Sequence, residues 1–513
     1  MPNTDVLIVG AGPTGLVLAL FLARHGVRVR IVDKAAEPGT TSRALAVHAR
    51  TLELYRPVGL ADTVVERGLR FAGANFWVRG RRVARAELGA MGTGISPFPY
   101  VVIFPQDEHE RLLIERLRAE GVTVERPVAC AAFDDRGDRV VARLTRDNGA
   151  EETCEAAWIV GCDGARSMVR EQIGESFPGG TYTHLFYVAD AEATGPVMDH
   201  ELHVALDDAD FLAAFPLKAD GHARFIGTVT AAAAARHGTL EWKDVSPEVI
   251  EHVGVTVKRI NWFSTYHVHH RVVRRFRSGR AFLAGDAAHI HSPVGGQGMN
   301  TGIGDAINLA WKLAAAVQAR ADPSILDSYE PERIAFARRL VATTDRAFQL
   351  VTSPGRLAAF VRIHLVPRVL PLVFRSTAFR RMMFRTISQT LIEYRASPLS
   401  QGGAGRVRAG DRLPWIDMVG SPGSDNYAPL TALDWQLHVY GEPAPATLDA
   451  ARACGVAVHA FAWRDTMGAA GLERDALYLL RPDGYVGFAA PAAGAGALAD
   501  YLRTWRIVTR GAP

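Results

Sequence analysis

The strongest constraint on the fold is a glycine-rich turn near the N-terminus, G-A-G-P-T-G at residues 10–15. It follows a short β-branched run and precedes a stretch that is apolar around most of its circumference. A second, strictly alternating run ends at the acidic residue Asp33. A strand, a glycine turn, a buried helix and a strand closed by an acid together predict the first unit of a parallel sheet that binds a dinucleotide.

Each glycine of this turn has its own physical role in such a motif. Gly10 permits the tight turn, Gly12 lets the backbone approach a pyrophosphate, and Gly15 allows close packing of helix on strand. The helix start offers unpaired N–H groups and partial positive charge to the phosphates, while Asp33 can accept hydrogen bonds from ribose hydroxyls. The cofactor contacts predicted in this segment are Gly10, Gly12, Pro13, Gly15, Asp33 and Lys34. Without a ligand, the same pattern would be a plain tight turn.

A second motif lies at residues 280–317. A short apolar run ends at Gly285 and Asp286, a glycine-rich loop follows, and a helix with apolar residues at a 3.6 period is predicted to begin near Thr301. Bare glycines at 295, 296 and 298 let successive N–H groups face a planar, electron-rich ligand. A flavin gains negative charge at its pyrimidine end on reduction and suits this environment. An ordinary glycine-rich loop is the alternative.

A third motif, C-D-G-A-R-S at residues 162–167, follows the strand-like run W-I-V-G. Alone it could equally be a turn with a surface ion pair.

In order and spacing, the three motifs resemble those of the single-component FAD-dependent aromatic hydroxylases, represented by para-hydroxybenzoate hydroxylase. The resemblance spans about residues 3–345 and includes residues 42–54 and the pair Pro105-Gln106. It implies that Asp33, Arg43 and Gln106 contact FAD. It also implies that Asp163 supports the cofactor region and that Asp286 binds the ribityl or ribose portion. The isoalloxazine would be lined by Pro293, Gly295, Gly296, Gln297, Gly298, Met299 and Asn300.

The same resemblance implies the reaction. NAD(P)H visits without a nucleotide domain of its own and reduces the flavin, dioxygen forms a peroxyflavin, and oxygen passes to a phenolic or polycyclic aromatic substrate. No second G-x-G-x-x-G follows a strand-like run, in agreement with this scheme. No side-chain acid or base can be identified by spacing, so the catalytic residue is unknown. A Baeyer–Villiger oxygenation of a polyketide ketone and a non-catalytic flavin-holding protein stay open as alternatives.

The region 175–275 consists mostly of strand-like runs separated by Asp and Gly turns, which predicts a mixed sheet. We expect this sheet to bind the substrate. Phe211, Phe215 and Trp262 lie on its strands and are candidates for the pocket, although aromatic residues in strands also serve as core. His267, His269 and His270 are interpreted as partly exposed strand residues rather than metal ligands, and no metal site is predicted.

The fold class predicted is α/β. A Rossmann-like FAD-binding domain, at residues 1–174 and 276–345, is interrupted by a mixed β-sheet substrate domain at 175–275. An Arg-rich helical linker at 346–401 then leads to a thioredoxin-like α/β C-terminal domain at 402–513. This tail resembles that of phenol and polyketide-tailoring members but lacks C-x-x-C, so we expect it to be redox-inert and to serve packing or contact in a homodimer.

Composition narrows the partners. A net charge of +4 argues for neither nucleic acid nor membrane, and the apolar stretch 357–374 carries arginines and prolines that disfavour a membrane span. Residues 351–400 hold eight arginines and one glutamate, so a structural linker is favoured over contact with an anionic membrane. Four cysteines without metal-site spacing suggest a reducing, cytoplasmic location. The C-terminal extension favours a tailoring oxygenase of secondary metabolism acting on a polycyclic compound.

Overall fold

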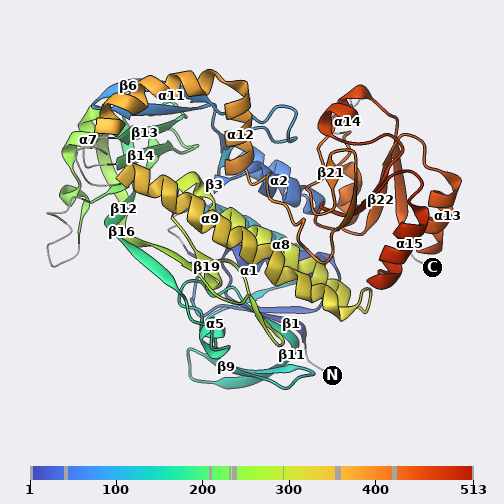
Figure 1. Ribbon diagram of the computed structural model, residues 1–513. Helices are drawn as coiled ribbons and strands as arrows, with labels where there is room; N and C mark the ends of the chain where they lie inside the picture. Colours follow the sequence, from blue (N-terminus) through green and yellow to red (C-terminus); the bar gives the residue numbers. More distant parts are fainter. Residues whose placement is uncertain are drawn as a thin grey trace.

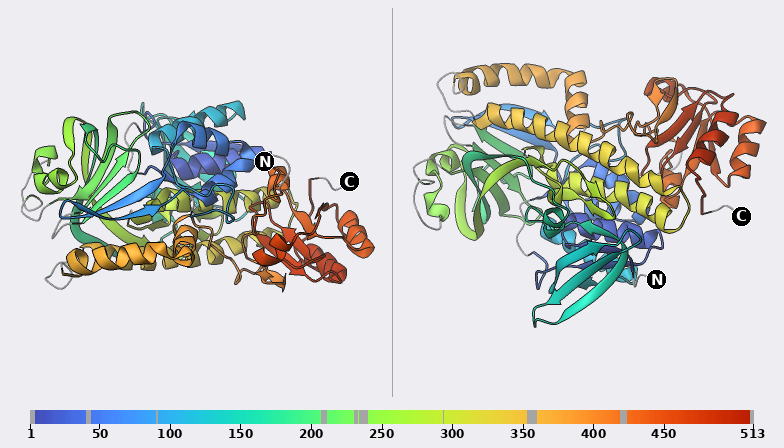
Figure 2. Two further views of the ribbon diagram at one scale, coloured as in Figure 1. Left: turned by 90° about the horizontal axis from the view of Figure 1, so that it is seen from above. Right: turned by 60° about the horizontal axis from the view of Figure 1, so that its bottom comes forward.

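The computed structural model describes residues 4–39, 44–89, 91–206, 211–229, 233, 240–292, 294–352, 360–418 and 424–510. These residues form two eight-stranded sheets, a six-stranded sheet and a small three-stranded sheet, surrounded by helices. The second eight-stranded sheet and the C-terminal unit lie at opposite ends of the molecule in both views of Figure 2. The α/β fold class predicted from the sequence is confirmed.

The first sheet contains the glycine-rich turn. Its strand order is β17-β18-β11-β1-β2-β8, and β9 and β10 continue from β11 as an antiparallel meander. The strands are β1 (Thr4–Val9), β2 (Val29–Val32), β8 (Val124–Glu125), β9 (Val128–Asp135), β10 (Val140–Arg146), β11 (Glu151–Gly161), β17 (Arg277–Ser278) and β18 (Ala281–Leu283). In the parallel part, Gly161 lies beside both Val9 and Leu283, so these strands end at one edge. Helix α1 (Pro13–Arg24) is buried from Gly15 to Leu22, as its apolar sequence predicts.

The second sheet has the order β19-β16-β12-β15-β14-β13-β5-β6. The strands are β5 (Gly73–Val78), β6 (Arg81–Glu87), β12 (Gly179–Thr194), β13 (Leu202–Leu206), β14 (Phe211–Pro216), β15 (His222–Thr228), β16 (Thr256–Val272) and β19 (His289–Ile290). The pairing of β5 with β13 is parallel and the other pairings are antiparallel, which makes the sheet mixed. The structure therefore adds three strands from outside 175–275. Their membership depends on edge hydrogen bonds to distant strands, which local sequence does not record.

Two long helices, α8 (Gly298–Val317) and α9 (Tyr329–Thr352), cross the centre of the molecule (Figure 1). Helix α8 begins three residues before the predicted start. Its amphipathic sequence suggests that its polar side chains face solvent. In the structure, Asp305, Asn308 and Lys312 are buried along with its apolar side chains. Their burial means that other charged groups must lie against them.

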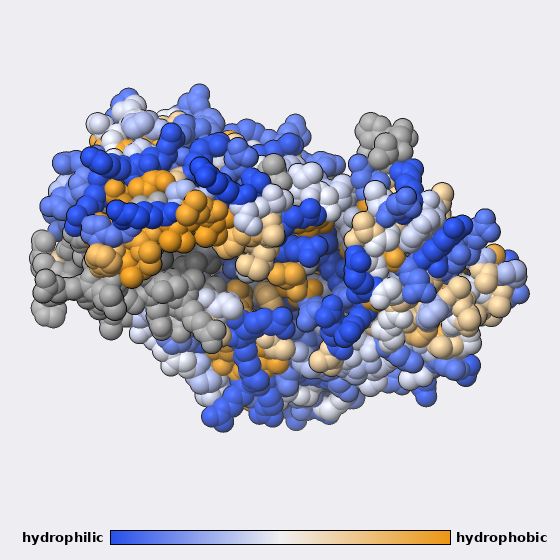
Figure 3. All heavy atoms as spheres, turned by 45° about the horizontal axis from the view of Figure 1, so that its top comes forward, coloured by the Kyte–Doolittle hydropathy of each residue, from blue (hydrophilic) through white to orange (hydrophobic). Residues whose placement is uncertain are grey.

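The arginine-rich region forms helices in its described part. A π-helical turn (Val361–Leu365) and α11 (Val366–Arg375) lead to α12 (Thr377–Ile387). Leu365, Val369 and Leu372 are exposed, and Figure 3 shows apolar side chains gathered over this part of the surface with charged ones between them. Within the described residues, no helix has both the length and the apolar character needed to cross a membrane.

The C-terminal unit is built on a sheet of order β21-β20-β25-β24-β22-β23. The strands are β20 (Gln401–Ala404), β21 (Val407–Arg408), β22 (Gln436–Tyr440), β23 (Ala457–Phe461), β24 (Leu477–Leu480) and β25 (Val486–Ala490), and the helices are α13 (Pro445–Ala453), α14 (Asp465–Ala470) and α15 (Ala495–Thr504). The glycine-rich stretch 401–410, which follows the predicted helical linker, forms the β20–β21 hairpin. Its glycines satisfy the turn: Gly405 between the two strands has a φ of +61°.

Candidate active site

Three motif loops meet at the edge where β1, β11 and β18 end. Val9, Gly161 and Leu283 are neighbours in the sheet, so residues 10–15, 162–167 and 285–290 all leave from the same place. The loops touch one another, because a Cβ on Gly285 would come within 2.6 Å of the Thr14 hydroxyl oxygen. Ligands of open α/β sheets bind at this carboxyl edge.

The three glycines of the first loop differ in what surrounds them. Gly10 has a φ of +101°, and a Cβ there would clash with the carbonyl oxygen of Cys162. A Cβ on Gly15 would clash with the carbonyl oxygen of Gly10. At Gly12, nothing lies within 4 Å of where a Cβ would be. Gly10 and Gly15 therefore allow close packing, whereas Gly12 leaves open the approach to the uncapped N-terminus of α1.

Asp33 is held beside this turn. Its two carboxylate oxygens accept hydrogen bonds from the N–H groups of Ala11 (2.7 Å) and Ala35 (2.8 Å). The Arg126 guanidinium lies 3.2 Å from the same carboxylate and also donates to the carbonyl of Ala11. Lys34 is exposed. Arg126 was missed by the sequence reasoning because it belongs to no motif, and its cation adds to the positive field at the turn.

Asp163 has a carboxylate oxygen whose hydrogen-bonding capacity is unmet. One carboxylate oxygen accepts from the N–H groups of Met168 (2.7 Å) and Val169 (3.3 Å). The other is buried and has no partner among the described residues. Burial raises the pKa of this carboxyl. A buried oxygen without a partner is costly unless a ligand supplies a donor, so the site fits a polar cofactor.

Asp286 and Gln106 are two further residues predicted to contact the cofactor. Asp286 is exposed in the short turn after β18. Gln106 begins α4 (Gln106–Ala119), and its side chain donates to Glu110 at 2.8 Å. Arg43 and Pro293 lie outside the described residues.

In the loop before α8, the carbonyl groups of two consecutive glycines point toward the side chain of His48. Gly295 and Gly296 have φ values of +77° and +62°. The Nε2 atom of His48 lies 2.8 Å from the Gly295 oxygen and 3.2 Å from the Gly296 oxygen, and donates to them. Burial lowers the pKa of His48 to about 4, so the imidazole is neutral. His48 was not among the predicted residues, although it lies within the segment 42–54 that carries the resemblance.

Asn300 completes this support. Its amide nitrogen donates to the carbonyls of Ala46 (2.8 Å) and Gly296 (2.9 Å). Its oxygen accepts from the backbone N–H of His48 (3.0 Å) and the Thr51 hydroxyl (2.7 Å). The side chain is therefore fully used in holding the loop. Its predicted contact with the isoalloxazine stays a prediction.

The first turn of α8 faces the same region. The helix begins at Gly298 without a side-chain cap, and a Cβ on Gly298 would meet no atom closer than the His291 ring at 3.8 Å. Gln297 is buried and Met299 packs against the core. Unpaired N–H groups at the start of a long helix stabilise negative charge, as a reduced flavin requires.

Phe211, Phe215 and Trp262 share one face of the second sheet. Phe215 pairs across the sheet with Arg224, Arg224 with Asp190, and Asp190 with Trp262. Cross-strand partners point to the same side, and Phe211 joins them because it lies four residues before Phe215 on β14. The predicted residues are thus brought together on one surface.

This sheet face borders the glycine loop. Phe215 stacks on Phe71, with ring centroids 6.3 Å apart, in a cluster that includes Leu45 and Ala46. A Cβ on Gly296 would lie 2.8 Å from the Cβ of Ala46. The cluster that contains Ala46 and Phe71 therefore lies between the aromatic face and the loop.

Further residues of this face were missed by the sequence reasoning. Tyr266 follows Trp262 at a spacing of four on β16 and packs with Phe186 and Phe211. An ion pair joins the buried Arg224 guanidinium to the half-buried Asp190 at 2.6 and 2.7 Å. Alternation along β16 could have identified Tyr266. The ion pair depends on strand register, which the sequence does not specify.

The neighbouring histidines make ordinary contacts. His269 Nδ1 lies 2.7 Å from the Thr181 hydroxyl, and the His270 ring packs on Tyr182.

Known proteins are similar to this chain in both sequence and fold. A family model described as FAD binding domain matches residues 3–344. The 6-methylpretetramide 4-monooxygenase of Streptomyces rimosus is 38% identical over 80% of this chain and 74% of its own length. The 12-dehydrotetracycline 5-monooxygenase/anhydrotetracycline 6-monooxygenase of Streptomyces rimosus subsp. rimosus is 33% identical over 98% of both chains. The structure of OxyS anhydrotetracycline hydroxylase from Streptomyces rimosus superposes with a TM-score of 0.78 and 30% identity, covering 98% of this chain and 99% of that one. The last two matches include the C-terminal unit.

Proposed function

This chain belongs to the family of FAD-dependent aromatic hydroxylases, and from that premise we propose that it hydroxylates a polycyclic phenolic compound of secondary metabolism. It is a monooxygenase that uses FAD, with NAD(P)H as the reductant. When bound, FAD supplies the activation of dioxygen, which no amino-acid side chain can provide. The protein orients the reactants and stabilises developing charge.

The cofactor-binding residues are part of the proposal. The open approach at Gly12 and the unpartnered Asp163 oxygen fit the phosphate and polar portions of FAD. The ribityl chain would lie near Asp286. The first turn of α8 and the loop at 294–298, held from behind by His48 and Asn300, would support the isoalloxazine.

The observation that carries the substrate class is the aromatic sheet face beside the glycine loop. Phe211, Phe215 and Trp262 present flat apolar surface, and the Arg224–Asp190 pair places one polar group among them. A planar polycycle with a few oxygen substituents would match this surface. Two relatives, the 6-methylpretetramide 4-monooxygenase and the 12-dehydrotetracycline 5-monooxygenase/anhydrotetracycline 6-monooxygenase, support the same class.

The test is oxidation of NAD(P)H and uptake of oxygen by FAD-loaded protein. We expect polycyclic phenols to stimulate both, and the product to carry one new hydroxyl group on a ring carbon by NMR. Simple benzoates run in parallel as the control. Stimulation by benzoates alone would contradict the polycyclic substrate, and oxygen inserted beside a ketone would indicate a Baeyer–Villiger reaction instead. Ligand binding without any oxidation of NAD(P)H would leave only a flavin-holding role.

Three finer expectations are also proposed. The location is cytoplasmic, consistent with four free cysteines, of which three are buried. The chain forms a homodimer, which sedimentation equilibrium would test. The C-terminal unit is redox-inert, since its one cysteine, Cys454, has no second cysteine within its own unit.

A further inference from the structure

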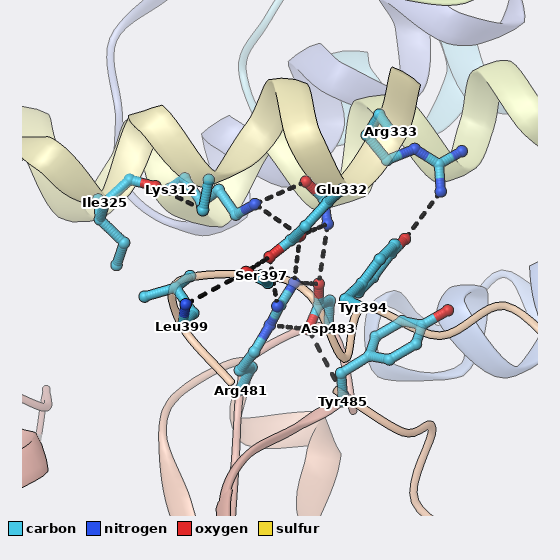
Figure 4. Close-up of polar contacts among 12 residues, drawn as sticks. Lys312, Ile325, Glu332, Arg333, Tyr394, Ser397, Leu399, Arg481, Asp483 and Tyr485 are labelled. Atoms are coloured by element: carbon cyan, nitrogen blue, oxygen red, sulfur yellow. Dashed lines mark hydrogen bonds and ion pairs between the residues drawn. The ribbon is translucent and has the colours of Figure 1, made fainter. Parts of the chain in front are cut away.

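A buried cluster of charges joins the C-terminal unit to the centre of the molecule (Figure 4). Glu332 on α9 lies at its middle and accepts hydrogen bonds from Arg481 (2.8 and 3.0 Å), Lys312 (2.8 Å) and Ser397 (2.6 Å). Asp483 accepts from Arg481 and, at 3.1 Å, from the indole N–H of Trp311. Two cations therefore meet two anions, and the buried charges balance.

The buried charges of this cluster stabilise one another. Burial alone would raise the pKa of Glu332, but Arg481 and Lys312 hold it well below its usual value. Burial lowers the pKa of Lys312 to about 8, against the opposing effect of Glu332. Removing one partner of such a cluster leaves an uncompensated charge in the interior. The contact between the C-terminal unit and helices α8 and α9 is thus a specific one.

The next residue of α9 leads from this cluster to a motif loop. Arg333 donates to Asp305 at 2.6 Å, and the other oxygen of Asp305 accepts from the Gly285 N–H (3.0 Å) and lies 2.6 Å from His289 Nε2. Gly285 and His289 flank the turn that carries Asp286. The position of this turn is therefore set by Asp305, and the position of Asp305 by Arg333.

Tyr394 ties the two networks together. Its hydroxyl accepts a hydrogen bond from Arg333 at 2.7 Å. Its ring packs on Tyr485 of the C-terminal unit with centroids 4.4 Å apart, and the Arg481 guanidinium lies 5.2 Å from its centre. Figure 4 shows Tyr394 between Arg333 on α9 and Tyr485 in the C-terminal unit.

We propose that the C-terminal unit and the segment leading to it complete the flavin site, with Tyr394 of that segment and Tyr485 of the unit acting as positioning residues that orient Arg333, and through Asp305 the turn at 285–289. The inference rests on the proposed binding of FAD at that turn. It assigns to the redox-inert tail a role beyond packing: part of the affinity for FAD comes from Tyr394 and Tyr485, which lie about 110 and 200 positions after the turn in sequence.

The test compares two buried tyrosine hydroxyls. Tyr394→Phe removes only the oxygen that accepts from Arg333 and keeps the ring between Tyr485 and Arg481. Tyr501→Phe is the matched control, because the Tyr501 hydroxyl is equally buried and donates to the Leu399 carbonyl at 2.8 Å, away from Arg333. Each apoprotein is titrated with FAD, and the dissociation constant, the visible spectrum of the bound flavin and the urea midpoint are recorded.

We expect Tyr394→Phe to raise the dissociation constant for FAD about tenfold, as loss of one charge-assisted hydrogen bond implies, and to shift the flavin spectrum. Tyr501→Phe should lower the urea midpoint without changing either flavin property. Tyr485→Leu should act in the same direction as Tyr394→Phe, and the double variant should bind FAD no more weakly than the weaker single variant.

The outcomes separate the two proposals. If the wild-type apoprotein fails to bind FAD, the proposed function is wrong. If the wild type binds and Tyr394→Phe binds equally with the same spectrum, the positioning role is wrong. Equal weakening by Tyr501→Phe would also overturn it, because general loosening of the junction would then explain the effect.

Discussion

Replacing Gly12 by Ala separates ligand approach from packing within a single turn. Gly12 has a φ of −77° and a ψ of −177°, a conformation open to alanine, and no atom lies within 4 Å of the added Cβ. The apoprotein should therefore fold almost normally, with a loss of about 0.5–1 kcal/mol because alanine is a poorer N-cap residue than glycine. FAD binding should suffer, since the new methyl group occupies the space through which a phosphate approaches the N–H groups of α1.

The size of the effect follows from the contact that is lost. A phosphate displaced by one methyl group forfeits at least one charge-assisted hydrogen bond, worth about 1.5–3 kcal/mol. The dissociation constant for FAD should rise about 10- to 150-fold. Fluorescence titration of apoprotein with FAD measures this change, and urea unfolding of the same sample measures the stability.

Two other glycines provide the comparison. A Cβ on Gly15 would clash with the backbone oxygen of Gly10, which cannot move aside, so Gly15→Ala should destabilise the apoprotein by about 1–3 kcal/mol or more. Gly496, in the first turn of α15, is also open within 4 Å and lies in the C-terminal unit. Gly496→Ala should leave FAD affinity unchanged and add up to about 1 kcal/mol of stability. Wild-type FAD affinity in Gly12→Ala would refute the placement of the phosphates at this turn.

Three further outcomes are expected. Phe215→Ala should raise KM for an aromatic substrate about tenfold through lost ring contact while leaving the FAD dissociation constant unchanged; Phe263→Ala, on the opposite sheet face against Tyr187, should change stability but not KM. His48→Leu should weaken FAD binding and shift the flavin spectrum, because the Gly295 and Gly296 carbonyls lose their donor; an unchanged spectrum would argue against its support of the loop. His109 is buried and its pKa is lowered from 6.5 to about 4, so the unfolded chain binds a proton that the folded chain does not as the pH falls through this window, and stability is lost. Urea unfolding between pH 7 and 5 should show a mean slope that His109→Gln reduces by about 1 kcal/mol per pH unit, and an unaltered slope would contradict the buried neutral state.

The parts of the site that sequence predicts well are those encoded by consecutive residues. Glycines at fixed spacing after a β run specify the turn at 10–15, and the structure shows close backbone contacts at Gly10 and Gly15 and open space at Gly12. The strand-like runs of 175–275 likewise placed Phe211 and Phe215 on strands of the second sheet, where the structure has them on β14. Each of these inferences needs only a local period, which the backbone geometry enforces.

The parts that sequence does not predict depend on pairing between distant segments. Arg126 reaches Asp33 from a loop more than ninety residues away, and β5 and β6 join a sheet whose other strands follow much later. The resemblance predicts that Asn300 lines the isoalloxazine. Its partners within the protein, Ala46 and Thr51, lie some 250 residues earlier in the sequence. No local pattern distinguishes a polar side chain that faces a ligand from one that holds the loop behind it.

Helix α8 shows how this distinction bears on function. Asp305, Asn308 and Lys312 follow one another at spacings of three and four, which on an isolated helix predicts a solvent-facing stripe. In the folded chain the stripe is buried, and its charges are met by Arg333 and Glu332 on α9. Burial of these groups is favourable only with their partners in place, and Glu332 in turn needs Arg481. The polar stripe of α8, which would face water on an isolated helix, thus forms part of the contact with the C-terminal unit. The first turn of the same helix supports the proposed flavin site.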